Sequence, residues 1–571
     1  MTDSYEKPAA GSDLPTVSEV RELFEELRGE WSQRNADYNR ARQMYDGEHW
    51  DQTTNPPAVG RYSLVANYIR PTVDGAVRDL FGRMPGMQVV PPGVDEMNRR
   101  KAEALEAVLY QSWMDNEAPL VFRRVAHNAI LVRRGILYTW WDPKRSIVRF
   151  RSCAPENFYP VYDGHDVVEA IYVTRVNTRL LRRRHPTVAD RIMPDAGSDW
   201  VGSGVASTES GVTDALGDEG SGRIMGTGGQ TTVYDWFDAQ GRWVRVMGDA
   251  RIAQTLRIGQ FPFVVVEDAV SGDEDEPRAA IEDVFELNQY LDQVISQQAD
   301  IIRKYSNPTI IDAGSGQPPE VVKKTVQGEG GVLPIRKDGT VAYLNWQGTP
   351  PDITAQFERV RATLMDLGGR NEAAYGRTIT NQSGVMTNMA LSPTVAAAQE
   401  RMSIFGLGLS HLNELILRTY EKNLGGATIK ATALRPRGES LSVFAPIMGE
   451  ITGTEIGGWY HNRIKWPAVL RTDDPVYVQT EISKMTANPP VQSVYTTMEN
   501  LGIEDVESER DRLQEQLQDP VWHPDRLQSA IEAAGALSQT SLDPAFEGLA
   551  PDGMGMAATA AGNPNRDLLA G

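Results

Sequence analysis

Apolar residues recur at three- and four-residue steps through the middle of the chain, beginning near residue 278. Within residues 278–305 this stripe consists of Ile281, Val284, Leu291, Ile295 and Ile302. The spacing places the side chains on one face of a helix. About 28 residues at 1.5 Å each make a helix of roughly 42 Å, which is longer than an ordinary compact domain needs. Asn307-Pro308 ends it, because proline lacks a backbone donor and disfavours the helical conformation in the preceding residue.

A glycine-rich segment over residues 306–350 has the pattern of short strands rather than of a helix. Residues 309–311 are rich in β-favouring side chains, and residues 331–335 lead through Asp338-Gly339 into residues 341–344. Asp-Gly between two such runs is a strong hairpin signal. The sequence therefore predicts a small β-hairpin unit after the long helix.

Two further helices follow. The first, over residues 351–369, has Asp352 as its expected N-cap and an apolar face that includes Phe357, Val360 and Leu364. The second is expected over residues 392–424, opening at Ser392-Pro393 and ending before two glycines. Residues 370–391 between them are polar and punctuated by glycine.

The rest of the chain alternates helical and strand patterns, so the sequence predicts a mixed α+β fold. Helices are expected over residues 17–45, 62–83, 98–116, 118–134 and 472–539. Strands are expected at 136–141, 147–151, 167–176, 427–445 and 461–469. Residues 1–16, an insertion at 195–229 and a tail at 540–571 lack an apolar period and are expected to be disordered. Trp140 and Trp141 alternate across a strand, which favours the core for either ring and leaves open that one meets a neighbouring subunit.

Composition narrows the class of protein. The 571 residues contain one cysteine, Cys153, so no internal disulfide and no cysteine-only zinc site can form. The N-terminus lacks the pattern of a signal peptide, and no apolar run is long enough to cross a bilayer, so we expect a cytoplasmic protein with no membrane partner. The net charge of −20 argues against a protein that grips nucleic acid. Acidic composition is also common in proteins that are simply soluble.

Motifs for catalysis are not found. The glycine runs at residues 226–232 and 328–331 lack the lysine of a phosphate-binding loop, and the seven histidines are scattered singly. No GxSxG motif occurs. We therefore predict no catalytic residue, cofactor or metal, although a metal site built from distant residues stays open. The basic run Arg182 to His185 fits a solvated edge better than a phosphate contact.

The order of these elements, with NQSGVMTNMA at residues 381–390 leading into the third helix, resembles the tailed-bacteriophage portal (head-to-tail connector) protein family. Segments at residues 70–74, 136–143, 146–163 and 261–268 also look like portal wing segments. The resemblance covers residues 17 to 530 and rests on the order of elements. It implies a wing at 17–277 and 425–471, stem helices at 278–305 and 351–369, a small α/β clip at 306–350, a tunnel loop at 370–391, a long wing helix at 392–424 and a crown at 472–539.

The resemblance also implies a function without catalysis. Portals form a ring, commonly of twelve copies, at one capsid vertex, and double-stranded DNA passes through the channel during packaging and ejection. Implied partners are the terminase large subunit, the major capsid and scaffolding proteins, and the head-tail adaptor. The protein would then reside in the virion after assembly in the host cytoplasm. Twelve copies of a chain with this net charge would give an acidic channel that repels DNA.

Three sets of site residues follow from the resemblance. Charged and amide side chains in the tunnel loop would contact DNA phosphates: Arg370, Asn371, Arg377, Asn381 and Gln382. Basic residues in the clip would meet terminase and adaptor: Lys323, Lys324, Arg336 and Lys337. Apolar residues would pack the stem and join subunits: Ile281, Val284, Leu291, Ile295, Ile302, Phe357, Val360 and Leu364.

The sequence is also compatible with other classes of protein. A DNA-packaging enzyme such as a nuclease or ATPase would need a phosphate loop or an acidic metal cluster, and neither pattern is found. A structural minor head protein of the virion would form no closed ring. A cellular helical scaffold is a further alternative, because the resemblance rests on arrangement.

Overall fold

The computed structural model describes a mixed α+β protein. The described residues are 14–50, 56, 61–163, 166–195, 229–268, 279, 281–306, 310–313, 316–327, 340–343, 351–368, 384–437, 443–467, 479, 482–484 and 493–500. Residues 505–571 form a separate unit outside this set. The expected insertion, the C-terminal tail and most of the expected crown also lie outside it. Within the described part, no helix is long and apolar enough to span a membrane.

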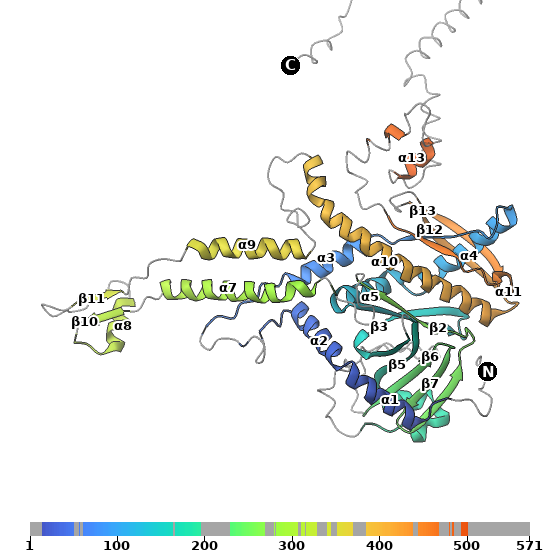
Figure 1. Cartoon of the computed structure of the whole chain (residues 1–571), viewed down its shortest axis with the longest axis horizontal. Coiled ribbons are helices and arrows are strands. Elements are labelled where there is room, and N and C mark those ends of the chain that lie inside the picture. Colours follow the sequence, from blue (N-terminus) through green and yellow to red (C-terminus); the bar gives the residue numbers. More distant parts are fainter. Residues whose placement is uncertain are drawn as a thin grey trace, which may run out of the picture. The chain divides into compact units, whose positions relative to one another are not determined.

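A central module surrounds the three-stranded antiparallel sheet β3-β2-β9. Its strands and helices are β2 (Arg134–Asp142), β3 (Ile147–Cys153), β9 (Phe263–Glu267), α3 (Ile69–Phe81), α4 (Glu96–Asp115), α5 (Ala118–Val132) and α10 (Gly384–Leu424). Figure 1 shows α5 and α10 close to this sheet. Leu105, Phe122 and Phe405 are among the fully buried side chains of the shared core. Trp140 and Trp141 are both buried, in two different clusters, so each packs within the chain.

A second sheet forms a β lobe with strand order β4-β5-β6-β7-β8, all antiparallel. Its elements are β4 (Phe158–Asp163), β5 (Asp166–Asn177), β6 (Gln230–Asp238), β7 (Arg242–Met247) and β8 (Ala250–Thr255), with the short helices η1 (Pro155–Asn157), α6 (Thr178–Arg184) and η2 (Pro186–Arg191). Helix α1 (Val17–Glu30) packs on it, with Phe24 edge-on to Tyr159. His185, at the end of the basic run, is buried, while Arg182 donates to the Ile192 carbonyl.

The expected helix over residues 17–45 is two helices, α1 and α2 (Ser32–Asp46). The break falls at Trp31, whose indole Nε1 donates to the Pro160 carbonyl oxygen at 3.2 Å. This tertiary contact draws the chain out of the helical path, so α1 packs on the β lobe and α2 on the central module. Periodicity alone did not reveal the break, because the apolar pattern of α1 leads into Trp31.

Helices α7 (Glu282–Ser306) and α9 (Pro351–Leu367) lie side by side (Figure 1). Between them in sequence come β10 (Ile310–Ala313), α8 (Pro319–Gln327) and β11 (Thr340–Tyr343). Strand β10 pairs with β11 in antiparallel register. The hairpin expected at residues 331–344 lies mostly outside the described part. Helix α8 was not expected from the residue pattern, although the resemblance implied a mixed α/β unit here.

Helix α10 begins at Gly384, eight residues before the expected start at Ser392, so the prediction of an N-cap there is wrong. Residues 385–391 include Met, Ala and Leu, which favour helix, and the helix continues through Pro393. An internal proline removes one backbone hydrogen bond and tends to bend a helix. Figure 1 shows α10 bending toward its N-terminal part.

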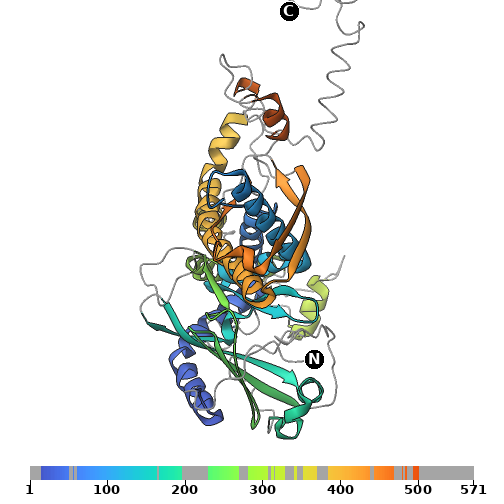
Figure 2. The same ribbon diagram turned by 90° about the vertical axis from the view of Figure 1, so that its right-hand side faces the viewer.

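The chain after α10 returns to the central module. Strands β12 (Thr428–Arg437) and β13 (Val443–Thr452) form an antiparallel pair against α4, and the short helix α11 (Gly453–Ile456) follows. Strand β14 (Asn462–Lys465) pairs with β1 (Gly86–Val89). Figure 2 shows α4 between α10 and the β12–β13 pair. The last described helix is α13 (Val494–Asn500).

Candidate functional site: the helical pair and its base

Four polar side chains follow one another along one face of α7, and each accepts a hydrogen bond from a backbone N–H of an extended segment, residues 61–68. The four contacts are Asn288 with Tyr68 N at 3.0 Å, Asp292 with Ala66 N at 2.7 Å, Ser296 with Leu64 N at 2.9 Å and Asp300 with Tyr62 N at 3.3 Å. We call this set the polar ladder. It ties the segment before α3 to the helix.

The four contacts form because the spacing of the ladder residues along α7 matches the spacing of alternate backbone N–H groups along the extended segment. Four residues of helix advance about 6 Å, and two residues of an extended chain advance roughly 6.6 Å. Every second backbone N–H of residues 62–68 therefore meets the next ladder side chain, with the segment running opposite to α7. This pairing explains why helix α3 starts at Ile69 and not near residue 62 as expected. The N–H groups of Tyr62, Leu64, Ala66 and Tyr68 have acceptors on α7, so these four donors do not need a helix to be satisfied.

His49 completes the base of α7 behind the ladder. Its Nδ1 lies 2.5 Å from an Asp292 carboxylate oxygen, and its Nε2 lies 2.8 Å from the Met44 carbonyl oxygen. The side chains of His49 and Asp292 are fully buried. Buried polar groups are stable when they are paired, so this contact fixes α7 against the end of α2.

Arg133 fixes the first turn of α7 to the central module. It follows α5 with a φ of 69°, a left-handed conformation that is uncommon for a residue with a side chain. Its Nη2 donates to Glu282 at 2.9 Å and to Asp37 of α2 at 3.2 Å. Burial lowers the pKa of Arg133, but the hydrogen bond and negative charge of Glu282 outweigh it and raise that pKa above its ordinary value. The strained backbone is offset by two charged contacts.

Helix α9 packs antiparallel to α7. Ile281 and Leu367 line one cavity, and farther along the pair Gln356 donates to the Tyr290 hydroxyl. The predicted packing residues Val284, Leu291, Val360 and Leu364 are buried, and Ile295 and Phe357 are partly buried. Ile281 is also buried, one residue before the helix begins.

Ile302 differs from the rest of the stripe, because its side chain is 62% exposed in the single chain, and its predicted role in joining subunits stays a prediction. The buried part of the stripe contacts α2, α3 and α9 of the same chain. The helix therefore buries its apolar face within the chain. The buried half of the α7 stripe is therefore not available for contact with another chain.

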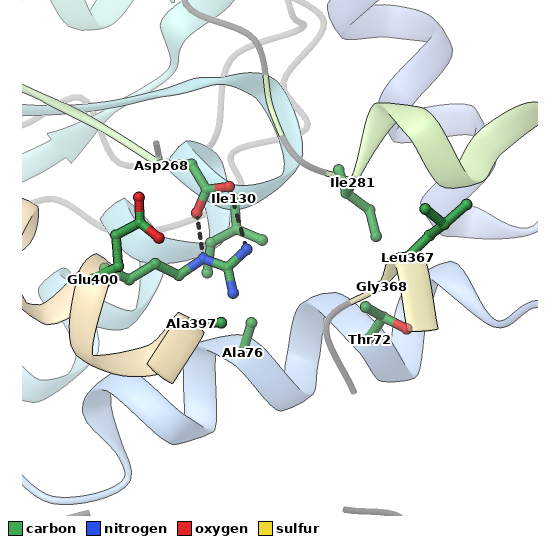
Figure 3. Close-up of a pocket in the computed structure, with 10 residues that line it drawn as sticks. Thr72, Ala76, Ile130, Asp268, Ile281, Leu367, Gly368, Ala397 and Glu400 are labelled. Atoms are coloured by element: carbon green, nitrogen blue, oxygen red, sulfur yellow. Dashed lines mark hydrogen bonds and ion pairs between the residues drawn. The ribbon is translucent and has the colours of Figure 1, made fainter. Parts of the chain in front are cut away.

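A cavity of about 170 Å³ lies where α3, α7, α9 and α10 meet (Figure 3). Its walls are mostly apolar, and its polar side chains are Thr72, Glu400 and an ion pair between Arg401 of α10 and Asp268, just after β9. Arg401 Nε donates to Asp268 at 2.7 Å, and the carboxylate is almost fully buried. Leu367 and Gly368 at the end of α9 line the same cavity. The junction therefore lies beside the C-terminal end of α9.

The predicted DNA-contact residues Arg370, Asn371, Arg377, Asn381 and Gln382 lie outside the described residues, as do Arg336 and Lys337. Lys323 and Lys324 fall in α8, where Lys324 is exposed. The structure brings these two lysines onto one short helix and does not place the other predicted contacts. Val322 of the same helix is buried, which orients α8 on its neighbours.

The chemistry of the described site is that of a packed junction. Among the described residues, no group of three or more His, Cys, Asp or Glu side chains could hold a metal ion. The ladder residues were missed by sequence reasoning, although their signal was present as polar side chains at four-residue steps beside the apolar stripe. No protein-family model matches the chain, and a search of curated proteins finds no significant match.

Proposed function

We propose that this chain is the subunit of a phage portal, a ring at one capsid vertex through which double-stranded DNA enters during packaging and leaves at infection. The observation that carries the proposal is the order and anchoring of α7, the β10–α8–β11 unit, α9 and α10. An antiparallel helix pair is fixed at one end in an α+β module and carries a small α/β unit between its helices in sequence. A 41-residue helix then crosses that module.

The anchoring fits a part that must transmit load. The polar ladder, the His49 contact and Arg133 each join the base of α7 to a different element of the module. Charged and buried hydrogen bonds hold their geometry better than apolar contacts alone. In the proposed ring, a motor docked on the β10–α8–β11 unit would push against this base.

The chain would act as a conduit. A separate terminase would supply the force, and exposed Lys324 on α8 belongs to the surface proposed to meet it and later the adaptor. Residues 370–383, the part of the predicted tunnel loop that precedes α10, would give weak phosphate contacts that carry no sequence information. The excess of 77 acidic over 57 basic residues would keep DNA from adhering to the channel.

Negative-stain electron microscopy of the purified chain tests the proposal. We expect end-on views of closed rings with a central hole wide enough for duplex DNA. A monodisperse monomer or small compact oligomer, unchanged across salt and protein concentration, would overturn the proposal. That result would favour a minor head protein or a packaging enzyme instead.

A further inference from the structure

One face of the β12–β13 pair is covered by α4, and the side chains of the other face are not covered by any element of the described part of the chain. The covered face carries small side chains, and a Cβ added at Gly449 would lie 2.6 Å from the Ala104 Cα, so sheet and helix are in direct backbone contact. Ala431, Ala433 and Ile447 on this face are buried. The covered side thus has its partner within the chain.

The open face carries apolar side chains in three successive cross-strand pairs, with Thr432 as the one polar member. These pairs are Thr432 with Met448, Leu434 with Pro446, and Pro436 with Phe444. Met448 is 75% exposed, Phe444 57% and Leu434 51%. The next pair on the same face, Lys430 with Glu450, forms an ion pair at 3.5 Å. We call the three apolar pairs the open patch; an apolar centre beside a charged rim is the composition of an interaction surface.

A further exposed apolar side chain, Leu407, lies on α10. Leu407 is 74% exposed, in a row with Ser403 and His411, which are also exposed. The inward side of the helix meets β9 so closely that a Cβ at Gly408 would lie 2.5 Å from Val266 Cγ2. Leu407 is therefore held outward on a helix that is fixed to the module.

The two features belong to elements that lie on opposite sides of α4 (Figure 2). Helix α4 separates α10 from the β12–β13 pair (Figure 2). After α10, Gly425 adopts a left-handed conformation and its carbonyl accepts from Thr454 N at 2.8 Å, so the helix and the strand pair keep a fixed relation. A ring with head-to-tail contacts requires two different surfaces on opposite sides of each subunit.

We propose that the open patch is the docking surface for a second copy of this chain, and that Leu407 of that copy packs on Leu434, Phe444 and Met448. The inference rests on the proposed function in that it assigns the contact between neighbouring ring subunits. Neighbouring subunits would then be joined by this contact rather than by the buried part of the apolar stripe of α7. A stable interface buries about 800 Å² on each partner, so this contact would be the apolar centre of a larger one.

Charge substitution at the two surfaces tests the contact. In Leu407→Glu and Met448→Glu, a carboxylate would be buried without a partner, so we expect the fraction of chains in rings to fall by about tenfold or more. Leu120→Glu on α5 and Met114→Glu on α4 are matched controls, since those side chains are 51% and 52% exposed at other places. Mass photometry gives the ring fraction, and circular dichroism checks that each variant is folded.

Mixing the two variants tests the head-to-tail geometry. Each variant keeps one intact surface, so an equimolar mixture should form a heterodimer that cannot extend into a ring. If Leu407→Glu leaves rings intact while Met448→Glu abolishes them, the patch has another occupant, such as a second patch or a terminal segment. If both variants form rings like the wild type, the inference is wrong and the proposed function stands. A wild-type chain that forms no ring overturns both.

Thiol cross-linking gives a second measurement. The native Cys153 is buried, so the wild-type chain should not react with a short bismaleimide. A chain carrying both Leu407→Cys and Met448→Cys should give a ladder of multimers on a denaturing gel. A mixture of the two single-cysteine chains should stop at dimers, and either single variant alone should give none. Absence of the ladder from wild-type-like rings would contradict the contact.

Discussion

At the residue scale, the structure depends on buried polar groups beside the apolar stripe of α7. His49 and Asp292 are fully buried and contact each other, and Asp292 also accepts from Ala66 N. Removing one member of such a contact leaves the other without its partner in a site that water does not reach. These side chains therefore matter more for stability than their polar character suggests.

Asp292→Ala should lower the free energy of unfolding by about 3 kcal/mol, because it removes the carboxylate that His49 Nδ1 and the Ala66 amide contact. Urea unfolding followed by tryptophan fluorescence measures the loss. Hydrogen exchange at the Ala66 amide should also become faster. Asp366→Ala, at an exposed position of α9, is the control and should change little. Equal stability of the two variants would contradict the importance of the ladder.

His127 of α5 should make stability depend on pH. Burial lowers its pKa from the ordinary 6.5, and the positive charge of Arg42 lowers it further. The unfolded chain therefore takes up this proton first as the pH falls below 6.5, so the folded state loses stability down to the lowered pKa. At pH above 6.5 the contribution is fully present.

In His127→Gln this titration is absent, so the decline in stability between about pH 7 and pH 5 should be shallower than in the wild type. Thermal unfolding midpoints across that range measure the two slopes. The ring of His127 packs edge-on to Tyr45, so the variant is also expected to be less stable at every pH. Parallel curves for wild type and variant would show that His127 titrates alike in both states.

The sequence predicted apolar residues of α7 that are buried, but it did not predict the role of the polar residues beside them. Val284 and Leu291 were predicted to pack and are buried. The role of Asn288, Ser296 and Asp300 depends on which backbone amides face them, and residues 61–68 are more than 200 positions away in sequence. A spacing rule cannot identify that partner. Apolar character also does not tell whether a side chain is buried within the chain, since Ile302 of the same stripe is exposed.

At the element scale, helix α10 is placed by close approach to strand β9. Gly408 has no side chain, and a Cβ there would meet Val266 Cγ2 at 2.5 Å. Phe405, Leu409 and Leu412 pack on the same side of the helix in the core. The strand and helix can reach this distance only because position 408 is glycine.

Gly408→Ala should destabilise the protein by about 1 to 3 kcal/mol, because the added methyl group overlaps Val266 in a packed core. Val266→Ala should reduce that cost, so the double variant should be more stable than the sum of the single changes predicts. Gly29→Ala in α1 is the control, since nothing lies within 4 Å of the new Cβ. It should be neutral or stabilising by up to about 1 kcal/mol. Additive effects of Gly408→Ala and Val266→Ala would show that the two positions do not interact.

Element boundaries were predictable only where local signals decided them. The strands around Trp140 and the helix over residues 118–134 occur near their expected positions as β2 and α5. Three boundaries differ from the expected ones. A tertiary contact breaks the helix at Trp31, and the polar ladder delays the start of α3 until Ile69. Helix-favouring residues extend α10 back to Gly384. Helix α8 was missed because its nine residues are too few for periodicity to identify.

At the scale of the whole molecule, the negative net charge opposes affinity for DNA. The chain carries 77 acidic and 57 basic residues, giving a net charge of −20. Affinity for duplex DNA comes largely from lysine and arginine displacing counterions from phosphates. A channel through which DNA slides needs weak affinity for the duplex, whereas an enzyme that processes DNA needs strong affinity.

We therefore expect the purified chain to bind a fluorescent duplex of about 20 base pairs with a Kd weaker than about 100 µM near 150 mM salt. The logarithm of the binding constant should change little with the logarithm of salt, because few phosphates are neutralised. Fluorescence anisotropy measures both quantities. Micromolar binding that weakens steeply with added salt would reveal a basic surface of the kind a nuclease or packaging ATPase uses. Together with rings in the micrographs, weak and salt-insensitive binding would support a conduit; without rings it would favour a structural protein that never encloses DNA.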